Sequence, residues 1–159
     1  MSTFNFIASD TELPEVDLTN VRKMKVKELK KLNPQARSPV PLDKLDENLE
    51  MLYCESEEDM KGLTISFCNN PPYNLDYHIK KKYVYWLRYD STEKCKDQLM
   101  EYLQKNIRET QQVEMWAITF GNKNDIYEVK DIREIKLSDL TKEDLMELNS
   151  QGICIQISC

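Results

Sequence analysis

Residues 113–120 constrain the fold of this chain more than any other segment. In the run Val-Glu-Met-Trp-Ala-Ile-Thr-Phe, large apolar side chains occupy both sets of alternate positions. A strand that is apolar on both faces is covered on both sides, so this segment predicts a central strand of a buried sheet.

The remaining apolar patterns place further strands and helices around that strand. Alternation typical of strands recurs at residues 4–8, 49–54, 63–67, 83–89, 132–137 and 153–157. A helix is predicted over residues 95–107, which place apolar side chains at i, i+4, i+7, i+8 and i+12 behind Asp90 and Ser91 as candidate caps. A short helix is expected after Thr141, which forms a capping box with Asp144. Another is expected at 26–32.

These elements predict an α+β fold. We expect a mixed, largely antiparallel sheet of about five to seven strands packed against two or three helices. The chain has 159 residues, 40% of them hydrophobic and 31% charged, which fits one domain spanning residues 1–159. No apolar run reaches the roughly 20 residues needed to span a bilayer, and the first residues do not have the pattern of a signal peptide. We therefore expect no association with membranes.

Cysteine usage favours a reducing compartment. The cysteines are odd in number and none has the C-x-x-C spacing; they are Cys54, Cys68, Cys95, Cys154 and Cys159. Small apolar side chains would serve equally well at most of these positions, so we interpret them as reduced core residues in a cytoplasmic protein.

The charge is unevenly spread along the chain. The net charge is -6, which disfavours binding to nucleic acid. Residues 22–37 are mostly basic, whereas residues 43–59 are mostly acidic, and the latter include Glu55, Glu57, Glu58 and Asp59. Such runs are often only solvated faces. The alternative is an acidic surface that binds a basic protein partner.

An aromatic segment is the second candidate surface. Tyr83, Tyr85 and Tyr89 share one face of the strand predicted at 83–89, and Trp86 lies on the other. Tyrosine and tryptophan are enriched at the centres of protein interfaces. They also favour strands and pack cores, so the sequence leaves both roles open.

No catalytic site is assigned from the sequence. Asn70-Pro71-Pro72-Tyr73 resembles the [DN]-P-P-[YFW] motif of amino-methyltransferases, which implies an amine held by the asparagine and a base stacked on the aromatic ring. That family also needs a glycine-rich turn for S-adenosylmethionine, and the glycines here, at 62, 121 and 152, are widely separated. The single histidine, His78, cannot form a metal cluster by itself. We therefore predict no metal and no cofactor.

These observations favour a non-catalytic binding protein, with a bacterial immunity-type protein that masks a basic partner as its concrete form. The candidate binding residues are Glu55, Glu57, Glu58, Asp59, Tyr83, Tyr85 and Tyr89. Two alternatives stay open. One is an enzyme with an unrecognised acid-base site, and the other is a structural protein that assembles with itself through a strand edge.

Overall fold

A computed structural model describes residues 1–159. The chain divides into two compact units, which we call unit 1 (Met1–Leu18 and Gly62–Cys159) and unit 2 (Thr19–Lys61). Unit 2 is therefore an insertion, in the sequence, between two segments of unit 1. The expectation of one domain over residues 1–159 stays a prediction.

Unit 1 is built on one seven-stranded sheet with the order β2-β5-β6-β1-β7-β9-β8. Every neighbouring pair is antiparallel except β8 and β9, which are parallel. The predicted α+β class with a mixed, largely antiparallel sheet is confirmed. The strands are β1 (Ser2–Ser9), β2 (Val16–Asp17), β5 (Thr64–Phe67), β6 (Tyr83–Arg88), β7 (Gln112–Phe120), β8 (Asp131–Lys136) and β9 (Ile153–Ser158).

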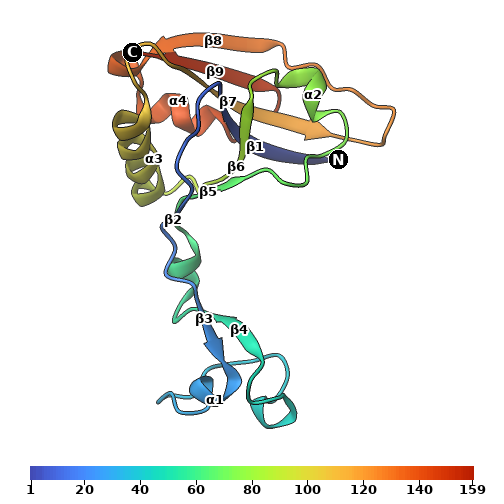
Figure 1. Ribbon diagram of the computed structural model, residues 1–159, viewed down its shortest axis with the longest axis vertical. Coiled ribbons are helices and arrows are strands. Elements are labelled where there is room, and N and C mark those ends of the chain that lie inside the picture. The colour runs from blue at the N-terminus through green and yellow to red at the C-terminus, as the bar shows by residue number, and fades with distance from the viewer. The chain divides into compact units, whose positions relative to one another are not determined.

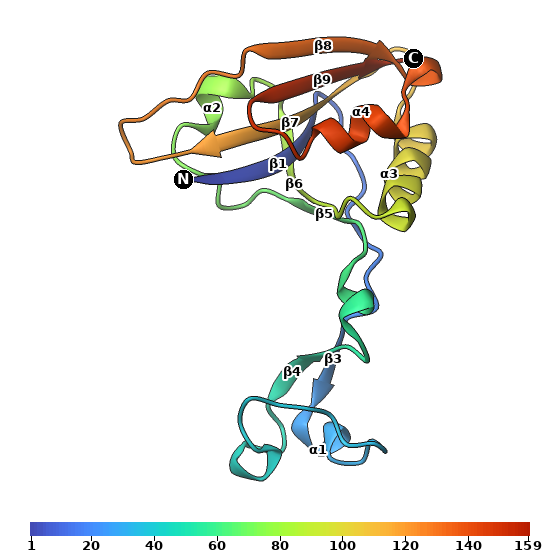
Figure 2. The same ribbon diagram turned by 180° about the vertical axis from the view of Figure 1, so that it is seen from behind.

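Helices cover both faces of this sheet (Figures 1 and 2). On one face lie α3 (Glu93–Asn106) and α4 (Lys142–Glu147), preceded by the 3-10 turn η3 (Leu137–Asp139). The short α2 (Leu75–His78) packs on the opposite face. As predicted, β7 is buried on both faces, because alternate residues belong to two different core clusters.

The two clusters follow the alternation of the strands. Ile7 and Met115 pack with Leu99 of α3 on the face that α3 and α4 cover. Phe6 and Trp116 pack under α2 on the other face. Neighbouring residues in one strand therefore belong to different cores, as the two-residue period of a strand requires.

The helix starts follow local side-chain chemistry. Thr92, rather than the expected Asp90 or Ser91, caps α3, because its hydroxyl accepts a hydrogen bond from the Cys95 backbone N–H at 3.4 Å. The predicted capping box of α4 is confirmed. The Thr141 hydroxyl accepts from the Asp144 N–H at 3.3 Å, and Asp144 Oδ2 accepts from the Thr141 N–H at 2.8 Å.

Unit 2 has a small core around an isolated two-stranded sheet. Its buried apolar side chains are Val26, Leu29 and Leu42. The strand expected at 49–54 is present, whereas the helix expected at 26–32 is only one turn long. The elements are β3 (Arg22–Lys25), α1 (Val26–Leu29), η1 (Leu42–Lys44), β4 (Glu50–Tyr53) and η2 (Glu57–Met60).

No helix in the chain combines the length and the apolar character that crossing a bilayer requires.

Candidate protein-binding surfaces

The four acidic residues expected to bind a partner lie together in unit 2, around η2. Glu55, Glu57 and Glu58 are exposed, and Asp59 is half-buried. Asp59 makes structural hydrogen bonds: its Oδ2 accepts from the backbone N–H groups of Glu55 and Ser56, each at 3.0 Å. A carboxylate that closes a turn in this way is not available to a partner.

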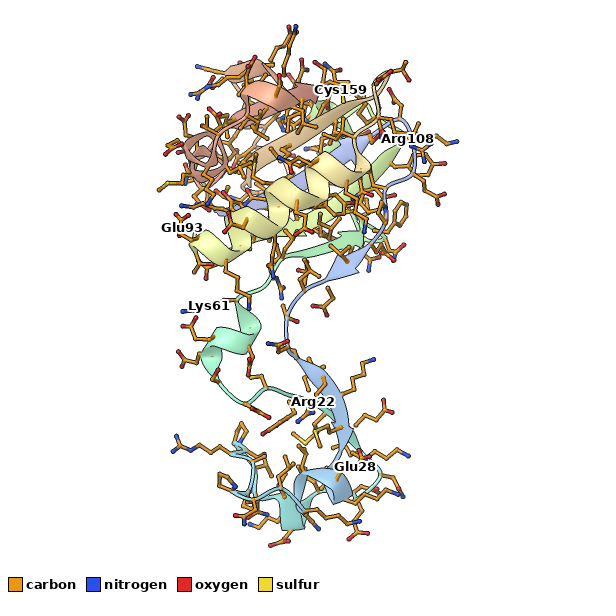
Figure 3. The ribbon with its side chains drawn as sticks, turned by 90° about the vertical axis from the view of Figure 1, so that its left-hand side faces the viewer. Arg22, Glu28, Lys61, Glu93, Arg108 and Cys159 are labelled. Atoms are coloured by element: carbon orange, nitrogen blue, oxygen red, sulfur yellow. The ribbon has the colours of Figure 1, made fainter.

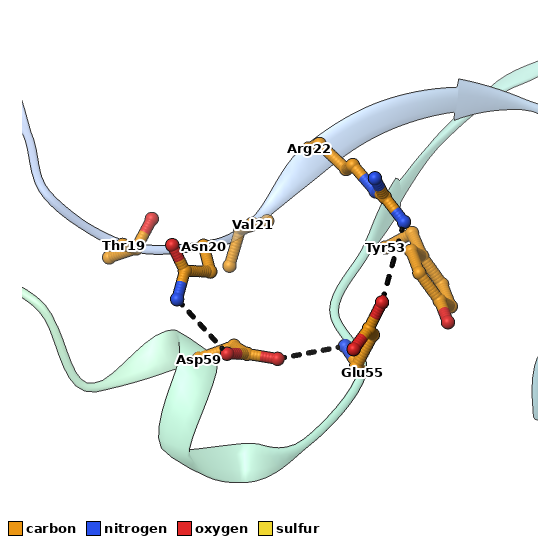
Figure 4. A pocket seen from close by; sticks show the side chains of 7 residues that line it. All are labelled: Thr19, Asn20, Val21, Arg22, Tyr53, Glu55 and Asp59. Carbon is orange, nitrogen blue, oxygen red and sulfur yellow. Dashed lines mark hydrogen bonds and ion pairs between the residues drawn. The ribbon is translucent and has the colours of Figure 1, made fainter.

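Figure 4 shows how the neighbouring charges are used within unit 2. Asn20 Nδ2 donates to Asp59 Oδ1 at 3.2 Å, and this hydrogen bond is the main reason why the pKa of Asp59 lies below its usual value. Arg22 forms an ion pair with Glu55 at 3.7 Å, and its guanidinium lies 5.3 Å from the centre of the Tyr53 ring. These residues line a cavity of about 440 Å³.

The charge balance of unit 2 also indicates that its acidic residues are used within the unit. Glu58 is paired with Lys61 at 2.8 Å, which leaves Glu57 as the acidic residue of the four without an ion pair or side-chain hydrogen bond. Unit 2 contains nine acidic and nine basic residues, so the acidic segment is offset within its own unit. The segment exists as expected, but its charge is largely neutralised locally.

Tyr85 and Tyr89 lie in the core, where they cannot contact a partner. Their exposed fractions are 2% and 8%. The Tyr85 hydroxyl accepts from the Leu13 N–H at 3.0 Å, and the Tyr89 hydroxyl donates to the Leu145 carbonyl. Burial raises the pKa of both phenols. The sequence left a core role and an interface role open for these tyrosines, and Tyr85 and Tyr89 take the core role, on the face of β6 that α3 and α4 cover.

Tyr83 and Trp86 are half-buried. Tyr83 packs against the edge of the core under α3 and α4, and the Lys82 ammonium lies 5.1 Å from the centre of its ring. Trp86 lies on the opposite face, where its ring is 5.6 Å from that of Phe4 and 4.9 Å from that of Phe6. Of the three predicted tyrosines, Tyr83 is thus the one that keeps substantial exposure.

A larger acidic surface is formed by α3, α4 and the residues that lead into them. We define the α3–α4 surface as the exposed side chains of residues 90–101 and 139–147. These two segments contain eight carboxylates and three lysines, a net charge of -5, whereas the whole chain carries -6. Most of the net charge of the protein therefore resides on one pair of neighbouring helices.

Ion pairs join the two helices of this surface. Lys142 at the start of α4 contacts Asp97 at 2.6 Å and Glu93 at 3.1 Å, both on α3. Glu93, labelled at the start of α3 in Figure 3, also pairs with Lys96 at 3.1 Å. Hydrogen bonds from Lys142 and Lys96 lower the pKa of Glu93. The remaining exposed carboxylates without a side-chain partner are Glu101, Asp139 and Glu143.

The sequence held part of the signal for this surface. Glu93, Asp97 and Glu101 are spaced four residues apart within the predicted helix, and that spacing places them on one helix face. Their proximity to Asp139 and Glu143 was not visible, because it depends on how α3 and α4 pack on the sheet.

The residues considered for catalysis are dispersed. No group of three histidine, cysteine or acidic side chains could hold a metal ion. His78 lies among aromatic rings, with ring centres 6.5 Å from Trp116 and 6.4 Å from Phe120, and burial lowers its pKa. Asn70–Tyr73 forms the connection between β5 and α2, and the Tyr73 side chain is 66% exposed.

Comparison of the chain with protein-family models, with curated proteins and with solved structures found no match.

Proposed function

We propose that this chain is a non-catalytic binding protein that masks a basic protein partner, in the manner of bacterial immunity proteins that neutralise a toxin. The observation that carries the proposal is the concentration of negative charge on the α3–α4 surface. A surface of one sign attracts a partner of the opposite sign and accelerates its association. The same charge repels the phosphate backbone of nucleic acid, so the proposed partner is a protein.

The proposed setting is the cytoplasm. The five cysteines are all unpaired, and Cys68, Cys95 and Cys154 are buried as small apolar side chains. Free buried thiols are typical of proteins in reducing compartments.

The α3–α4 surface supports this proposal better than the residues expected from the sequence. Glu55, Glu58 and Asp59 already have partners within unit 2, and Tyr85 and Tyr89 are in the core. Glu101, Asp139 and Glu143 are exposed without a side-chain partner, so their charges are free to act on a second molecule.

Self-assembly through a strand edge has less support. The outermost strand β8 pairs with β9 on one side, and its other edge has no strand partner. Asp131, Arg133, Glu134 and Lys136 place charge along this strand, and charged edge strands resist pairing with a second sheet.

The test is affinity capture from extract of the source cells with three variants of the tagged protein. The first, Glu101→Lys/Asp139→Lys/Glu143→Lys, reverses the free charges of the α3–α4 surface. The matched control, Glu109→Lys/Glu128→Lys/Glu134→Lys, makes the same change in net charge at exposed acidic residues elsewhere in unit 1. The third, Glu57→Lys/Glu58→Lys, reverses exposed charges of the segment predicted from the sequence.

We expect the wild type and the matched control to retain one basic protein, and the α3–α4 variant to bind it at least about tenfold more weakly. Retention should decrease as salt rises, because exposed charges are screened. Loss with Glu57→Lys/Glu58→Lys alone would instead support the segment predicted from the sequence. Equal loss in the first variant and its matched control would show that only the total charge matters, and would contradict the proposal.

A further inference from the structure

The sheet of unit 1 contains a gap between two of its inner strands. β1 pairs with β7 along its whole length, from Ser2 opposite Phe120 to Ser9 opposite Val113. Its pairing with β6 is shorter and ends at Phe6 opposite Trp86. Beyond that point β6 continues to Arg88 in register with β5, while β1 continues along β7, so the two strands run apart (Figure 1).

A cavity of about 790 Å³ lies where β1 and β6 part. Its lining includes three consecutive residues of β1, Thr3–Asn5, and the consecutive residues Trp86–Tyr89 of β6 and the position after it. Consecutive residues of a strand point to opposite faces. The lining includes residues that point to both faces, so the cavity opens between the edges of β1 and β6. It also extends over Thr64 and Ser66 of β5 and Val16 and Asp17 of β2, which lie beyond β6.

The unpaired edges carry backbone hydrogen-bonding groups. In an antiparallel sheet every second residue directs both its N–H and its C=O toward the same neighbouring strand. The stretch Ser2–Asn5, about 13 Å long at the usual rise of a strand, is paired on the β7 side and has no strand on the β6 side. It offers the groups with which a further strand would pair.

The side chains around the gap suit an extended peptide. The Asn5 side chain is a lining residue, and its Oδ1 is buried without a hydrogen-bond partner. Thr64 and Ser66 add hydroxyl groups from β5. The rings of Phe4 and Trp86 meet edge to face at 5.6 Å and form an apolar wall, with Phe4 41% exposed.

We infer that this gap is a binding slot for an extended strand of a partner polypeptide, which pairs with the free edge of β1 and completes the sheet. Addition of a strand to an unpaired edge is a general mode of peptide recognition, in which backbone hydrogen bonds supply affinity and side-chain pockets supply specificity. The bound strand would place an apolar side chain on Phe4 and Trp86. It would also offer a donor to the Asn5 amide oxygen. The slot is separate from the α3–α4 surface.

Asn5 allows a test in which a binding role and a structural role predict opposite results. In the free protein its buried oxygen has no partner, so Asn5→Leu should raise the unfolding temperature by a few degrees. The same substitution removes the acceptor, so it should weaken peptide binding about tenfold. A residue with a purely structural role would not combine a higher unfolding temperature with weaker peptide binding.

The probe is a display library of random seven-residue peptides, selected on the wild-type protein. Selected peptides should alternate β-branched or aromatic residues with polar ones. On binding, the alternate backbone amides of Ser2–Asn5 that point away from β7 should gain protection from hydrogen exchange. Ser66→Trp fills the slot from an exposed position and should reduce peptide affinity more than tenfold, whereas the matched control Ser138→Trp, on η3, should not.

Either of two results would overturn the inference. One is a selection that yields no peptide whose affinity depends on both Asn5 and Ser66. The other is a peptide that binds without protecting the amides of β1. The α3–α4 charge-reversal variant should bind the selected peptides like the wild type, so a failure of the slot and a failure of the proposed function are distinguishable.

Discussion

At the scale of single residues, hydrogen bonding decides which polar side chains stabilise the fold and which are free to act. Tyr89, Tyr102 and Asp59 each make a bond that holds backbone in place. Glu101 and Glu143 do not have such a bond and remain exposed. A charged or aromatic residue therefore supports binding only where the fold leaves its polar atoms unused.

Tyr89→Phe should lower the free energy of unfolding by about 1 kcal/mol, because it removes a buried hydrogen bond to the Leu145 carbonyl, which keeps only the Leu148 N–H as donor. Denaturation with urea measures this loss. Tyr83→Phe is the control, since the Tyr83 hydroxyl makes no hydrogen bond and the residue is half-buried. Equal effects of the two substitutions would show that the Tyr89 hydroxyl does not stabilise the core.

His78 should make stability depend on pH. Burial lowers its pKa in the folded protein below the usual 6.5, so the unfolded chain binds a proton more readily. The free energy of unfolding should therefore fall as pH falls through 6.5 toward the folded pKa, and should be constant below it as far as this group is concerned.

The measurement compares wild type with His78→Phe by urea denaturation between pH 7.5 and pH 5. The difference in unfolding free energy between the two proteins isolates the imidazole from the carboxylates, which both proteins share. As pH falls, the wild type should lose unfolding free energy relative to His78→Phe. A difference independent of pH would contradict the lowered pKa.

At the scale of elements, α3 and α4 depend on their caps and on their shared ion pairs. The capping box of Thr141 and Asp144 satisfies backbone groups at the start of α4. Lys142, the first residue of α4, then contacts both Glu93 and Asp97 of α3. One short segment thus starts a helix and places its acidic face beside that of its neighbour.

Thr141→Ala should cost about 1 kcal/mol of stability, because the hydroxyl that accepts from the Asp144 N–H is lost. Thermal unfolding measures the change, with Thr110→Ala as a control at an exposed threonine outside the helices. If α4 is positioned mainly by its buried Leu145 and Leu148, the two variants will unfold at the same temperature.

At the scale of the whole molecule, the insertion of unit 2 raises the question of independent folding. Unit 2 leaves unit 1 between β2 and β5, which are antiparallel neighbours, and the Leu18 N–H donates to the Leu63 carbonyl at 2.8 Å within unit 1. The ends of the insertion are therefore already held together by unit 1. Unit 2 itself has only three buried apolar side chains, those of Val26, Leu29 and Leu42.

Replacing Thr19–Lys61 with a short glycine-containing turn should leave unit 1 folded, with cooperative thermal unfolding, because its sheet and both of its larger cores are retained. The isolated peptide Thr19–Lys61 should be unfolded, since so small a core does not offset the chain entropy. Circular dichroism and calorimetry test both. Loss of cooperative unfolding in the shortened chain would favour a single folding unit over residues 1–159.

Much of this fold is determined locally by the sequence. The apolar period of residues 95–107 was sufficient to predict α3, the two apolar faces of residues 113–120 predicted β7, and Thr141 with Asp144 predicted the start of α4. Each of these signals comes from residues within a few positions of one another, where periodicity and side-chain capping act directly on the backbone.

The spacing of Glu93, Asp97 and Glu101 placed them on one helix face, but tertiary structure decided the rest of the surfaces. Alternation showed that Tyr85 and Trp86 point to opposite faces, but only the packing of α3 and α4 showed which face is the core. The end of pairing between Phe6 and Trp86 depends on how the strands on either side of them diverge. Contacts between residues far apart in the chain are set by packing of the whole sheet, so no local pattern of residues encodes them.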